Sequence, residues 1–298
     1  MDKKEKAYLE LALGKAIVGS TLVVGKFVVA SFPVFLASAL RLGIASAILV
    51  PLLLRREKGL PSVPRKDLLV MFLQAFLGVF LFSIALLYGL KLTTAIESGI
   101  ITSATPAIAG LASFLILKER LTWHKNTGIL LTVLGVLAIN IIGSSTGAER
   151  GSDPLLGNLL IFSAVISEAL FITLGKIASE EVTPLIISTM VSVFGFLMLL
   201  PFGIHEAARF DFAGLTLSDW LPIIYYGAIG TAVALVLWQE GVQKVTAGTA
   251  SVFTGFLPVS AMILSFIILK EPFAWSHVVG IIFIFLGIGF MSREPSES

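Results

Sequence analysis

Residues 113–119 read Ser-Phe-Leu-Ile-Leu-Lys-Glu, and residues 265–271 repeat them as Ser-Phe-Ile-Ile-Leu-Lys-Glu, 152 residues further on. The same offset aligns rarer residues elsewhere: Gly78 with Gly230, Pro106 with Pro258, Trp123 with Trp275, and Gly128 with Gly280. Chance readily matches apolar residues, but it seldom matches Lys-Glu, Pro, Trp and Gly in one register. The chain is therefore predicted to consist of two related halves, 1–148 and 149–298.

The composition indicates a chain whose solvent is lipid. Hydrophobic residues make up 56% of the 298 residues, charged residues 13%, and the mean hydropathy is +0.98. A soluble domain carries about 25% charged residues, so a chain this apolar could not keep a soluble surface polar. The sequence contains no cysteine, which excludes disulfides and thiolate metal sites.

Apolar runs of membrane-spanning length recur along the whole chain. A spanning helix takes about 20 residues, and these runs are too long and too uniformly apolar for the alternating strands of a membrane barrel. The fold class is therefore an all-α polytopic membrane protein with ten transmembrane helices, arranged as two inverted five-helix repeats. The predicted spans are 9–31, 33–54, 67–91, 95–117, 125–143, 154–178, 183–203, 219–245, 248–269 and 275–291.

The lysines and arginines predict how the chain crosses the membrane. If the N-terminus is cytoplasmic, the predicted cytoplasmic segments hold 14 of these residues and the opposite side holds 4, which satisfies the positive-inside rule. We therefore expect a multi-pass protein of the cell (plasma or inner) membrane with both termini in the cytoplasm and an uncleaved first span. Because five spans is an odd number, the second half enters the membrane upside down relative to the first, as in many secondary transporters.

The pattern of motifs resembles the drug/metabolite transporter superfamily, in particular its EamA-like family, over residues 9–291. The resemblance is carried by Gly25-Lys26, Ala39-Leu40-Arg41, Thr105-Pro106, Leu117-Lys118-Glu119-Arg120-Leu121 and the second-half elements Leu257-Pro258 and Leu269-Lys270-Glu271-Pro272. It implies ten helices, a substrate cavity between the halves, and export of amino acids, metabolites or drugs. In some members of the family, transport depends on the proton gradient.

Four charged residues inside predicted spans are candidates for the substrate cavity. Glu168 lies near the middle of the sixth span, where a carboxylate costs several kcal/mol unless it is neutralised, paired or hydrated. It is therefore the candidate for proton coupling, with a structural bond to a neighbouring helix as the alternative. Lys15 and Lys26 share a face of the first span, and either could instead extend to the membrane interface. For Arg41 we expect an ion pair or a capping role within the bundle, with substrate contact as the alternative.

Two prolines and two aromatic residues complete the predicted cavity. Pro106 and Pro258 lie near the centres of the fourth and ninth spans, where each would free the carbonyl four residues earlier, at Thr102 and Thr254. Broken helices near the midplane expose backbone groups to substrates in transporters, although a packing kink is the simpler alternative. Tyr88 and Trp238 are candidates for aromatic side chains that line the cavity.

Other polar residues are interpreted as structural. Glu97 begins the fourth span and is expected to be solvated at the outer interface, and Glu240 is expected to pair with Lys244 one helical turn away. Trp123 and Trp275 are interpreted as interface anchors.

We therefore predict a secondary transporter of a small metabolite, amino acid or drug-like compound, exporting it by alternating access. Its expected partners are a small-molecule substrate and the lipid bilayer, not nucleic acid, and monomer and homodimer are both open. No catalytic set, metal site, cofactor or phosphate-binding loop is predicted, so the chain is not expected to be an enzyme. The alternatives are an uncoupled facilitator or channel of the same fold, an intramembrane enzyme and a membrane scaffold. The substrate and the coupling ion are left undefined.

Overall fold

A computed structural model of the chain describes most of its residues. Well-placed segments cover 3–57, 63–102, 104–117, 151–175, 182–242, 256–271 and 275–291, with isolated residues at 123, 127, 128, 130, 131, 134, 135, 244 and 253. These residues form helices and short connections, with no strand among them. The all-α fold class is confirmed.

In the first half the helices follow the predicted spans. They are α1 (Lys3–Ser31), α2 (Val34–Arg56), α3 (Arg65–Ala75), the π-helical segment η1 (Phe76–Leu81), α4 (Phe82–Leu92), α5 (Ala95–Thr102) and α6 (Thr105–Leu117). The segments α3, η1 and α4 run on as one span, whereas α5 and α6 divide the fourth span in two. The fifth predicted span, 125–143, lies outside the described residues apart from isolated positions.

The second half follows the same order. It contains α8 (Pro154–Gly175), α9 (Pro184–Ala207), α10 (Leu217–Gly227), η2 (Ala228–Val233), α11 (Ala234–Val242), α13 (Phe256–Leu264), η3 (Ser265–Leu269) and α14 (Trp275–Met291). Among the described residues, seven helical segments are long and apolar enough to cross a membrane, and two shorter apolar helices, Val259–Leu269 and His277–Gly287, accompany them. A multi-pass membrane protein follows, while the count of ten stays a prediction.

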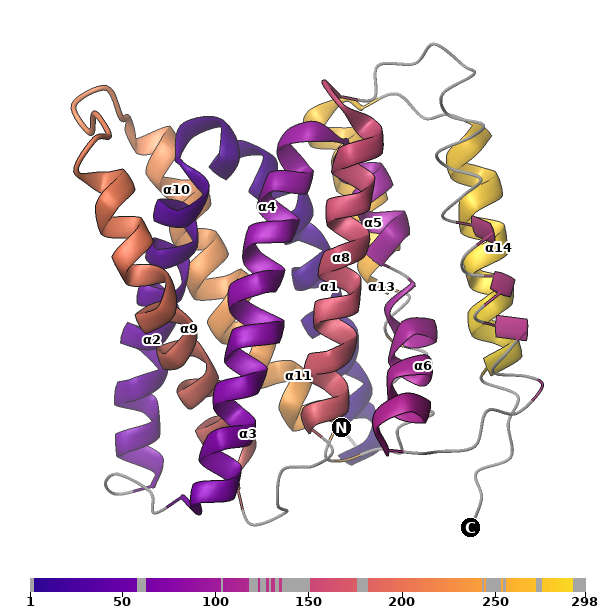
Figure 1. Cartoon of the computed structure of the whole chain (residues 1–298), viewed down its shortest axis with the longest axis horizontal. Coiled ribbons are helices and arrows are strands. Elements are labelled where there is room, and N and C mark those ends of the chain that lie inside the picture. The colour runs from indigo at the N-terminus through magenta and orange to yellow at the C-terminus, as the bar shows by residue number, and fades with distance from the viewer. Residues whose placement is uncertain are drawn as a thin grey trace.

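Local sequence explains where helices begin and end. Pro33 separates α1 from α2, because it lacks the N–H that would continue α1. Thr183 caps α9 by accepting a hydrogen bond from the backbone N–H of Ile186, and Pro184 occupies the first helical position. Thr216 and Asp219 form a capping box at the start of α10. The short connections therefore place neighbouring helices antiparallel (Figure 1).

The first helix of each predicted half packs against the other half. Helix α1 lies against α10, α11 and α13, and α8 lies against α3, α4, α5 and α6, while α2 packs on α9. In Figure 1, α1 begins at the lower end of the bundle and α8 begins at the upper end, so these two helices run in opposite directions. The central core includes Leu22, Ile100, Ile161, Tyr226 and Leu257, which come from both halves.

The π-helical segments η1 and η2 recur at the offset of the sequence repeat. Their bounds, Phe76–Leu81 and Ala228–Val233, are 152 residues apart. A π-helical segment inserts an extra residue into a helical turn and is uncommon, so its recurrence in one register is informative. The third such segment, η3, has no π-helical counterpart, since residues 113–117 belong to α6.

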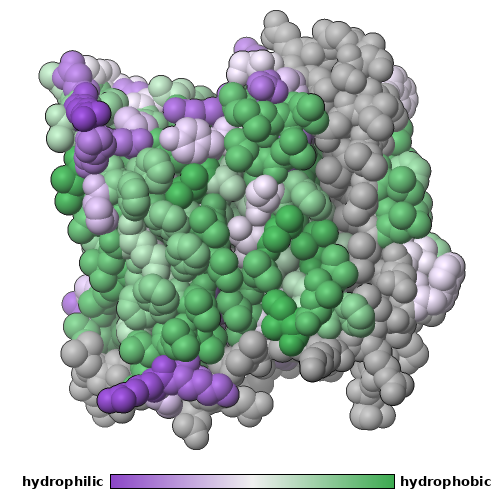
Figure 2. All heavy atoms as spheres, viewed as in Figure 1, coloured by the Kyte–Doolittle hydropathy of each residue, from purple (hydrophilic) through white to green (hydrophobic). Residues whose placement is uncertain are grey.

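The described residues on the face shown in Figure 2 are apolar between two polar ends. Large hydrophobic residues stand exposed on the bundle, such as Leu69, Leu115 and Ile267 at 59%, 66% and 64%. At the lower end, where α1 begins and α2 ends, the described basic residues are Lys3, Lys4, Lys6, Arg55, Arg56, Arg65, Lys66 and Lys244. At the upper end, where α1 ends and α2 begins, they are Lys26, Lys91, Arg209 and Lys270. The bias has the predicted direction, and the side of the membrane that each end faces stays a prediction.

The lower end is tied by ion pairs between helices. Lys244 Nζ lies 2.6 Å from Glu10 Oε2, and Arg56 lies 3.7 Å from Glu240 Oε1. Lys244 also lies 4.0 Å from Glu240, which confirms the expected pair, although Lys244 lies in a turn beyond the end of α11. The Arg56 side chain is 64% exposed, those of Lys244 and Glu240 are 35% exposed, and that of Glu10 is 7% exposed.

The upper end is tied by carboxylates that accept hydrogen bonds. Glu206 accepts from the backbone N–H of Leu36 at 2.7 Å. Glu271 accepts from the backbone N–H groups of Ala95 and Ile96 at 2.9 and 3.0 Å, which caps the start of α5. The Lys-Glu element of the second half thus contacts the fourth span of the first half.

Candidate functional site

Two charged candidates from different halves meet inside the bundle. Lys15 on α1 places its Nζ 3.7 Å from Oε1 of Glu168 on α8. The Lys15 side chain is 9% exposed and that of Glu168 is 20% exposed. Because these charges lie within apolar helices, their pairing offsets much of the cost of burying them. Together with Thr105, Thr102 and Trp238, which are described below, this pair forms what we call the ion-pair cluster.

The second carboxylate oxygen of Glu168 contacts the break between α5 and α6. Thr105 Oγ1 lies 2.9 Å from Glu168 Oε2 and 2.7 Å from the carbonyl oxygen of Thr102. A hydroxyl group carries one proton and can also accept. If Glu168 takes up a proton, it can donate to Thr105, which then donates to Thr102. The arrangement therefore accommodates both the charged and the neutral form of Glu168.

This break corrects the expected role of Pro106. The fourth span ends as α5 at Thr102 and restarts as α6 at Thr105, so Pro106 lies in the first turn of a helix, where its missing N–H costs nothing. The Thr102 carbonyl is not left free, since the Thr105 hydroxyl reaches it. Pro258 lies within α13, which the structure describes from Phe256 onward. Thr254 lies outside the described residues.

Trp238 completes the ion-pair cluster. Lys15 Nζ lies 4.2 Å from the centroid of the Trp238 ring on α11, close enough for a cation–π interaction. The cluster thus unites the predicted residues Lys15, Glu168, Thr102 and Trp238 with Thr105, which belongs to the Thr105-Pro106 motif of the sequence but is not among the predicted site residues. Its position before Pro106 is the signal that could have found it, because a hydroxyl beside a helix break can reach freed backbone groups.

Lys26 is held elsewhere, at the upper end. Its Nζ donates to the carbonyl oxygens of Leu90 and Thr93 at 2.8 and 2.6 Å. These carbonyl groups lie at the C-terminal end of α4, where the helix dipole also favours a cation. The structure therefore gives Lys26 a helix-capping role outside the ion-pair cluster.

A buried polar network below Lys26 corrects the expectation for Glu97. Its side chain is 0% exposed rather than solvated. Glu97 Oε2 accepts from Thr93 Oγ1 at 3.0 Å and from Asn158 Nδ2 at 2.5 Å, and Oε1 lies 3.9 Å from His277 Nε2. The sequence placed Glu97 correctly at a span end, but its neighbours arrive from α8 and α14.

Arg41 is the third interior cation, and its expected ion pair is not found. It is 8% exposed, and no ion pair among the described residues involves it. Its guanidinium contacts the hydroxyls of Ser83 and Thr231 and the ring of Tyr226. Tyr88, by contrast, is 36% exposed and packs on the ring of Phe35 at 6.4 Å.

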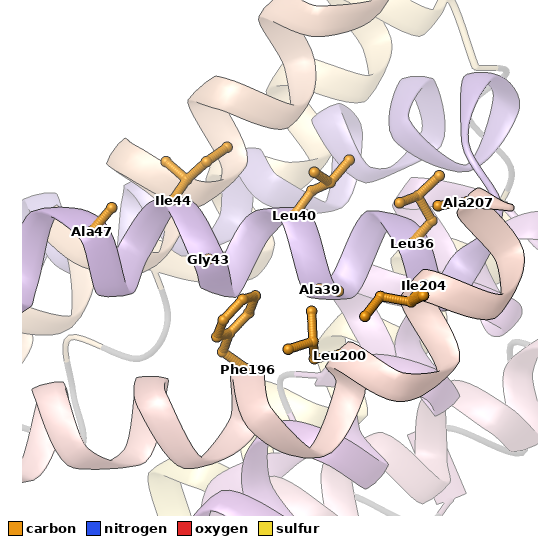
Figure 3. Close-up of a pocket in the computed structure, with 11 residues that line it drawn as sticks. Leu36, Ala39, Leu40, Gly43, Ile44, Ala47, Phe196, Leu200, Ile204 and Ala207 are labelled. Carbon is orange, nitrogen blue, oxygen red and sulfur yellow. The ribbon is translucent and has the colours of Figure 1, made fainter. Parts of the chain in front are cut away.

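Two grooves open on the sides of the bundle. The larger, of about 440 Å³, runs between α2 and α9, and only apolar side chains and glycines line it, among them Leu40, Gly43 and Phe196 (Figure 3). The second, of about 340 Å³, lies among α1, α10 and α13 and includes Ser20, whose hydroxyl lies 2.7 Å from that of Tyr225. Neither groove contains Lys15 or Glu168, so the polar chamber between the halves stays a prediction.

A multi-pass bundle that holds the carboxylates Glu97 and Glu168, the cations Lys15 and Arg41 and a broken helix in its interior has the build of a membrane transport protein, because such groups mark solute and ion pathways. The chain belongs to the EamA-like transporter family. The model of that family matches it twice, at residues 6–141 and 155–293. The predicted family is thereby confirmed, and membership in a transporter family fits a protein that is not an enzyme.

Curated relatives carry the same designation. The uncharacterized transporter YetK of Bacillus subtilis (strain 168) is 50% identical over 96% of this chain and 86% of its own length. The uncharacterized transporter YyaM of the same strain is 25% identical over 94% of this chain and 92% of its own length. An uncharacterized transporter of Archaeoglobus fulgidus is 25% identical over 97% of this chain and 99% of its own length. These three names specify no substrate.

A solved crystal structure of a protein shares the fold. It is 17% identical to this chain with a TM-score of 0.67, and the match covers 96% of this chain and 98% of the other. At this identity the likeness concerns the fold alone.

Proposed function

We propose that the protein is a secondary transporter that exports a small metabolite, amino acid or drug-like compound across the cell membrane by alternating access. The observation that carries the proposal is the ion-pair cluster, in which Lys15 of one half meets Glu168 of the other inside an apolar bundle. Such a pair couples the two halves, and its making or breaking can accompany their relative movement.

The proposal includes two inverted five-helix repeats, 1–148 and 149–298. Three findings support this organisation: the reciprocal packing of α1 and α8, the 152-residue offset between η1 and η2, and the two matches of the family model. Related units that face opposite sides of the membrane provide two similar conformations, one open to each side. The repeat thus supplies a physical basis for alternating access.

Proton coupling is a separate part of the proposal and rests on Glu168. Protonation would neutralise Glu168 and release Lys15 from the pair, while the new Glu168 O–H would donate to the Thr105 hydroxyl, which itself donates to the Thr102 carbonyl oxygen. The lysine released by this step would then be available to the substrate or to the rearrangement of α1. A proton gradient can in this way be converted into a change of packing between the halves.

The experiment combines a thermal-shift screen of the purified protein against metabolites with flux of the hits in proteoliposomes. Binding to the folded state raises the unfolding midpoint by mass action. We expect Glu168→Gln to insert normally and to lose flux driven by an imposed proton gradient. Glu240→Gln, which removes a partly exposed carboxylate at the lower end, is the matched control and should retain it.

The outcomes separate the proposal from its alternatives. Transport by Glu168→Gln at the wild-type rate under the same gradient would remove Glu168 from the coupling step. Flux that ignores the gradient and does not saturate would indicate a facilitator or channel of the same fold. Chemical turnover of a hit in detergent, where transport is undefined, would indicate an intramembrane enzyme.

A further inference from the structure

Arg41 lies inside the bundle, about 10 Å along α2 from its start, since it follows Val34 by seven residues. Its Nη2 donates to Ser83 Oγ of α4 at 2.7 Å, and its Nη1 lies 3.4 Å from Thr231 Oγ1 of η2. The guanidinium carbon lies 4.8 Å from the centroid of the Tyr226 ring on α10. Two spans, Arg65–Leu92 and Leu217–Gly241, thus converge on one buried cation of α2.

The charge of Arg41 is not neutralised by the described residues. Lys15 has Glu168, and Lys26 has two carbonyl oxygens at the end of a helix. Arg41 has two neutral hydroxyls and an aromatic face, and its Nε donates to no acceptor in the described segments. A guanidinium carries five N–H donors, and leaving a buried donor and a buried charge unmatched is costly. The structure therefore keeps an anion-binding group that its own described residues do not use.

One hydroxyl partner of Arg41 lies in a π-helical segment, and the other closely follows one. Thr231 lies within η2, where its own Oγ1 donates to the carbonyl oxygen of Tyr226 five residues earlier. Ser83 is the second residue after η1. Segments of this kind occur frequently at functional sites, because the extra residue loosens the backbone ladder and redirects side chains. Because the two segments come from different halves, a movement between the halves would change the contacts of Arg41 with Ser83 and Thr231.

We propose that Arg41 binds the anionic group of the transported molecule and that this group is a carboxylate. The inference rests on the proposed transport function and narrows its substrate class. A planar guanidinium matches a carboxylate in a two-point hydrogen bond, and the Ser83 and Thr231 hydroxyls can rotate to donate to the same oxygens. Substrates would then be organic acids or amino acids, rather than neutral or purely cationic compounds.

A purely structural Arg41 makes a different prediction for Arg41→Gln. If the guanidinium mainly held α2, α4 and α10 together, the substitution would lower the unfolding midpoint without ligand. If it awaits a ligand, Gln removes an unmatched charge while its amide can still donate to Ser83, and the midpoint without ligand should stay within a few degrees of the wild type. Arg41→Lys keeps the charge and removes the planar fork.

The binding test uses the full chain in detergent. The probes are monocarboxylates of two to eight carbons and the twenty amino acids, each paired with its primary amide. We expect at least one acid to raise the wild-type midpoint while its amide does not. The affinity of Arg41→Gln for that acid should fall by about 30-fold or more, the consequence of truncating one partner of a buried charge pair. The affinity of Arg41→Lys for the acid should lie between those of the wild type and Arg41→Gln. Replacing the exposed Arg209 at the upper end by Gln should change this affinity less than twofold.

Three results would overturn the proposal: equal stabilisation by acids and amides, equal stabilisation of wild type and Arg41→Gln by the same acid, or no stabilisation by any acid of the panel. Flux measurements separate its failure from that of transport itself. Flux of a compound without an anionic group, at the same rate in Arg41→Gln, would leave transport standing and remove the carboxylate site. Binding of an acid through Arg41 without flux of any hit would do the reverse.

Discussion

Burial should make the Lys15–Glu168 pair far more strongly coupled than an exposed pair of the same length. Its N–O distance is 3.7 Å, with side chains 9% and 20% exposed. Two unit charges at that distance attract by about 4 kcal/mol at an effective dielectric constant of 20. Glu168→Gln should lose only part of this attraction energy, because Lys15 keeps its contact with Trp238. We expect a loss of about 2 kcal/mol in the free energy of unfolding.

The measurement is a double-mutant cycle of Lys15→Met and Glu168→Gln. The purified protein is unfolded in mixed detergent micelles, and the interaction free energy is the departure of the double mutant from the sum of the two single changes. We expect a coupling of about 1–3 kcal/mol. The double mutant should be more stable than the less stable single mutant, because it no longer buries an unpaired charge.

The pair between Arg56 and Glu240 supplies the control. Its N–O distance is also 3.7 Å, but its side chains are 64% and 35% exposed. Solvent screens such a pair, so its own cycle, Arg56→Met with Glu240→Gln, should give no more than about 0.2–1 kcal/mol. Additivity within about 0.5 kcal/mol at Lys15 and Glu168 would show that the two side chains do not interact in the folded protein, and the ion-pair cluster would have to be abandoned.

Two further changes probe the packing between the halves. Glu271→Gln should cost about 1–2 kcal/mol of unfolding free energy, because it weakens the charge-assisted cap on Ala95 and Ile96. The control is Asp153→Asn at the exposed start of α8, which should cost less than about 0.5 kcal/mol. Equal costs for the two variants would contradict the cap. Gly19→Ala should cost about 1–3 kcal/mol or more, since its new methyl group would overlap Ser260 Oγ and the Leu257 carbonyl oxygen. Gly214→Ala, with nothing near its new methyl group, should stay within about 0.5 kcal/mol, and a neutral Gly19→Ala would mean that α1 and α13 are not in close contact.

The fold class could be predicted from the sequence because lipid imposes a length and an apolar character on every span. The runs 33–54 and 275–291 correspond to Val34–Arg56 and Trp275–Met291 within two residues. The irregular turns could not be predicted in this way. Nothing in Phe76–Leu81 distinguishes an inserted residue from an ordinary turn of apolar helix, and the division of the fourth span depends on how Thr102 and Thr105 are bonded.

The candidate site was predictable as a set of residue types and not as a set of contacts. A charge within an apolar run is costly wherever it lies, so Lys15, Arg41 and Glu168 can be recognised in the sequence without any knowledge of the packing. Which of them meet is decided by tertiary packing. Lys15 and Glu168 are 153 residues apart and pair because α1 crosses into the other half, whereas Arg41, expected to find a carboxylate, finds two hydroxyls.

The different ties at the two ends of the bundle bear on how dissolved salt acts on the molecule. Mobile ions at about 0.15 M screen exposed charges over roughly 8 Å, so they weaken the ties of Arg56 and Glu240 at the lower end. The upper-end bonds from Glu206 and Glu271 to backbone N–H groups are short and leave little room for counterions. Electrolyte should therefore weaken the exposed ties of the lower end and leave the bonds of the upper end largely intact, so that added salt acts on the two ends of the bundle unequally.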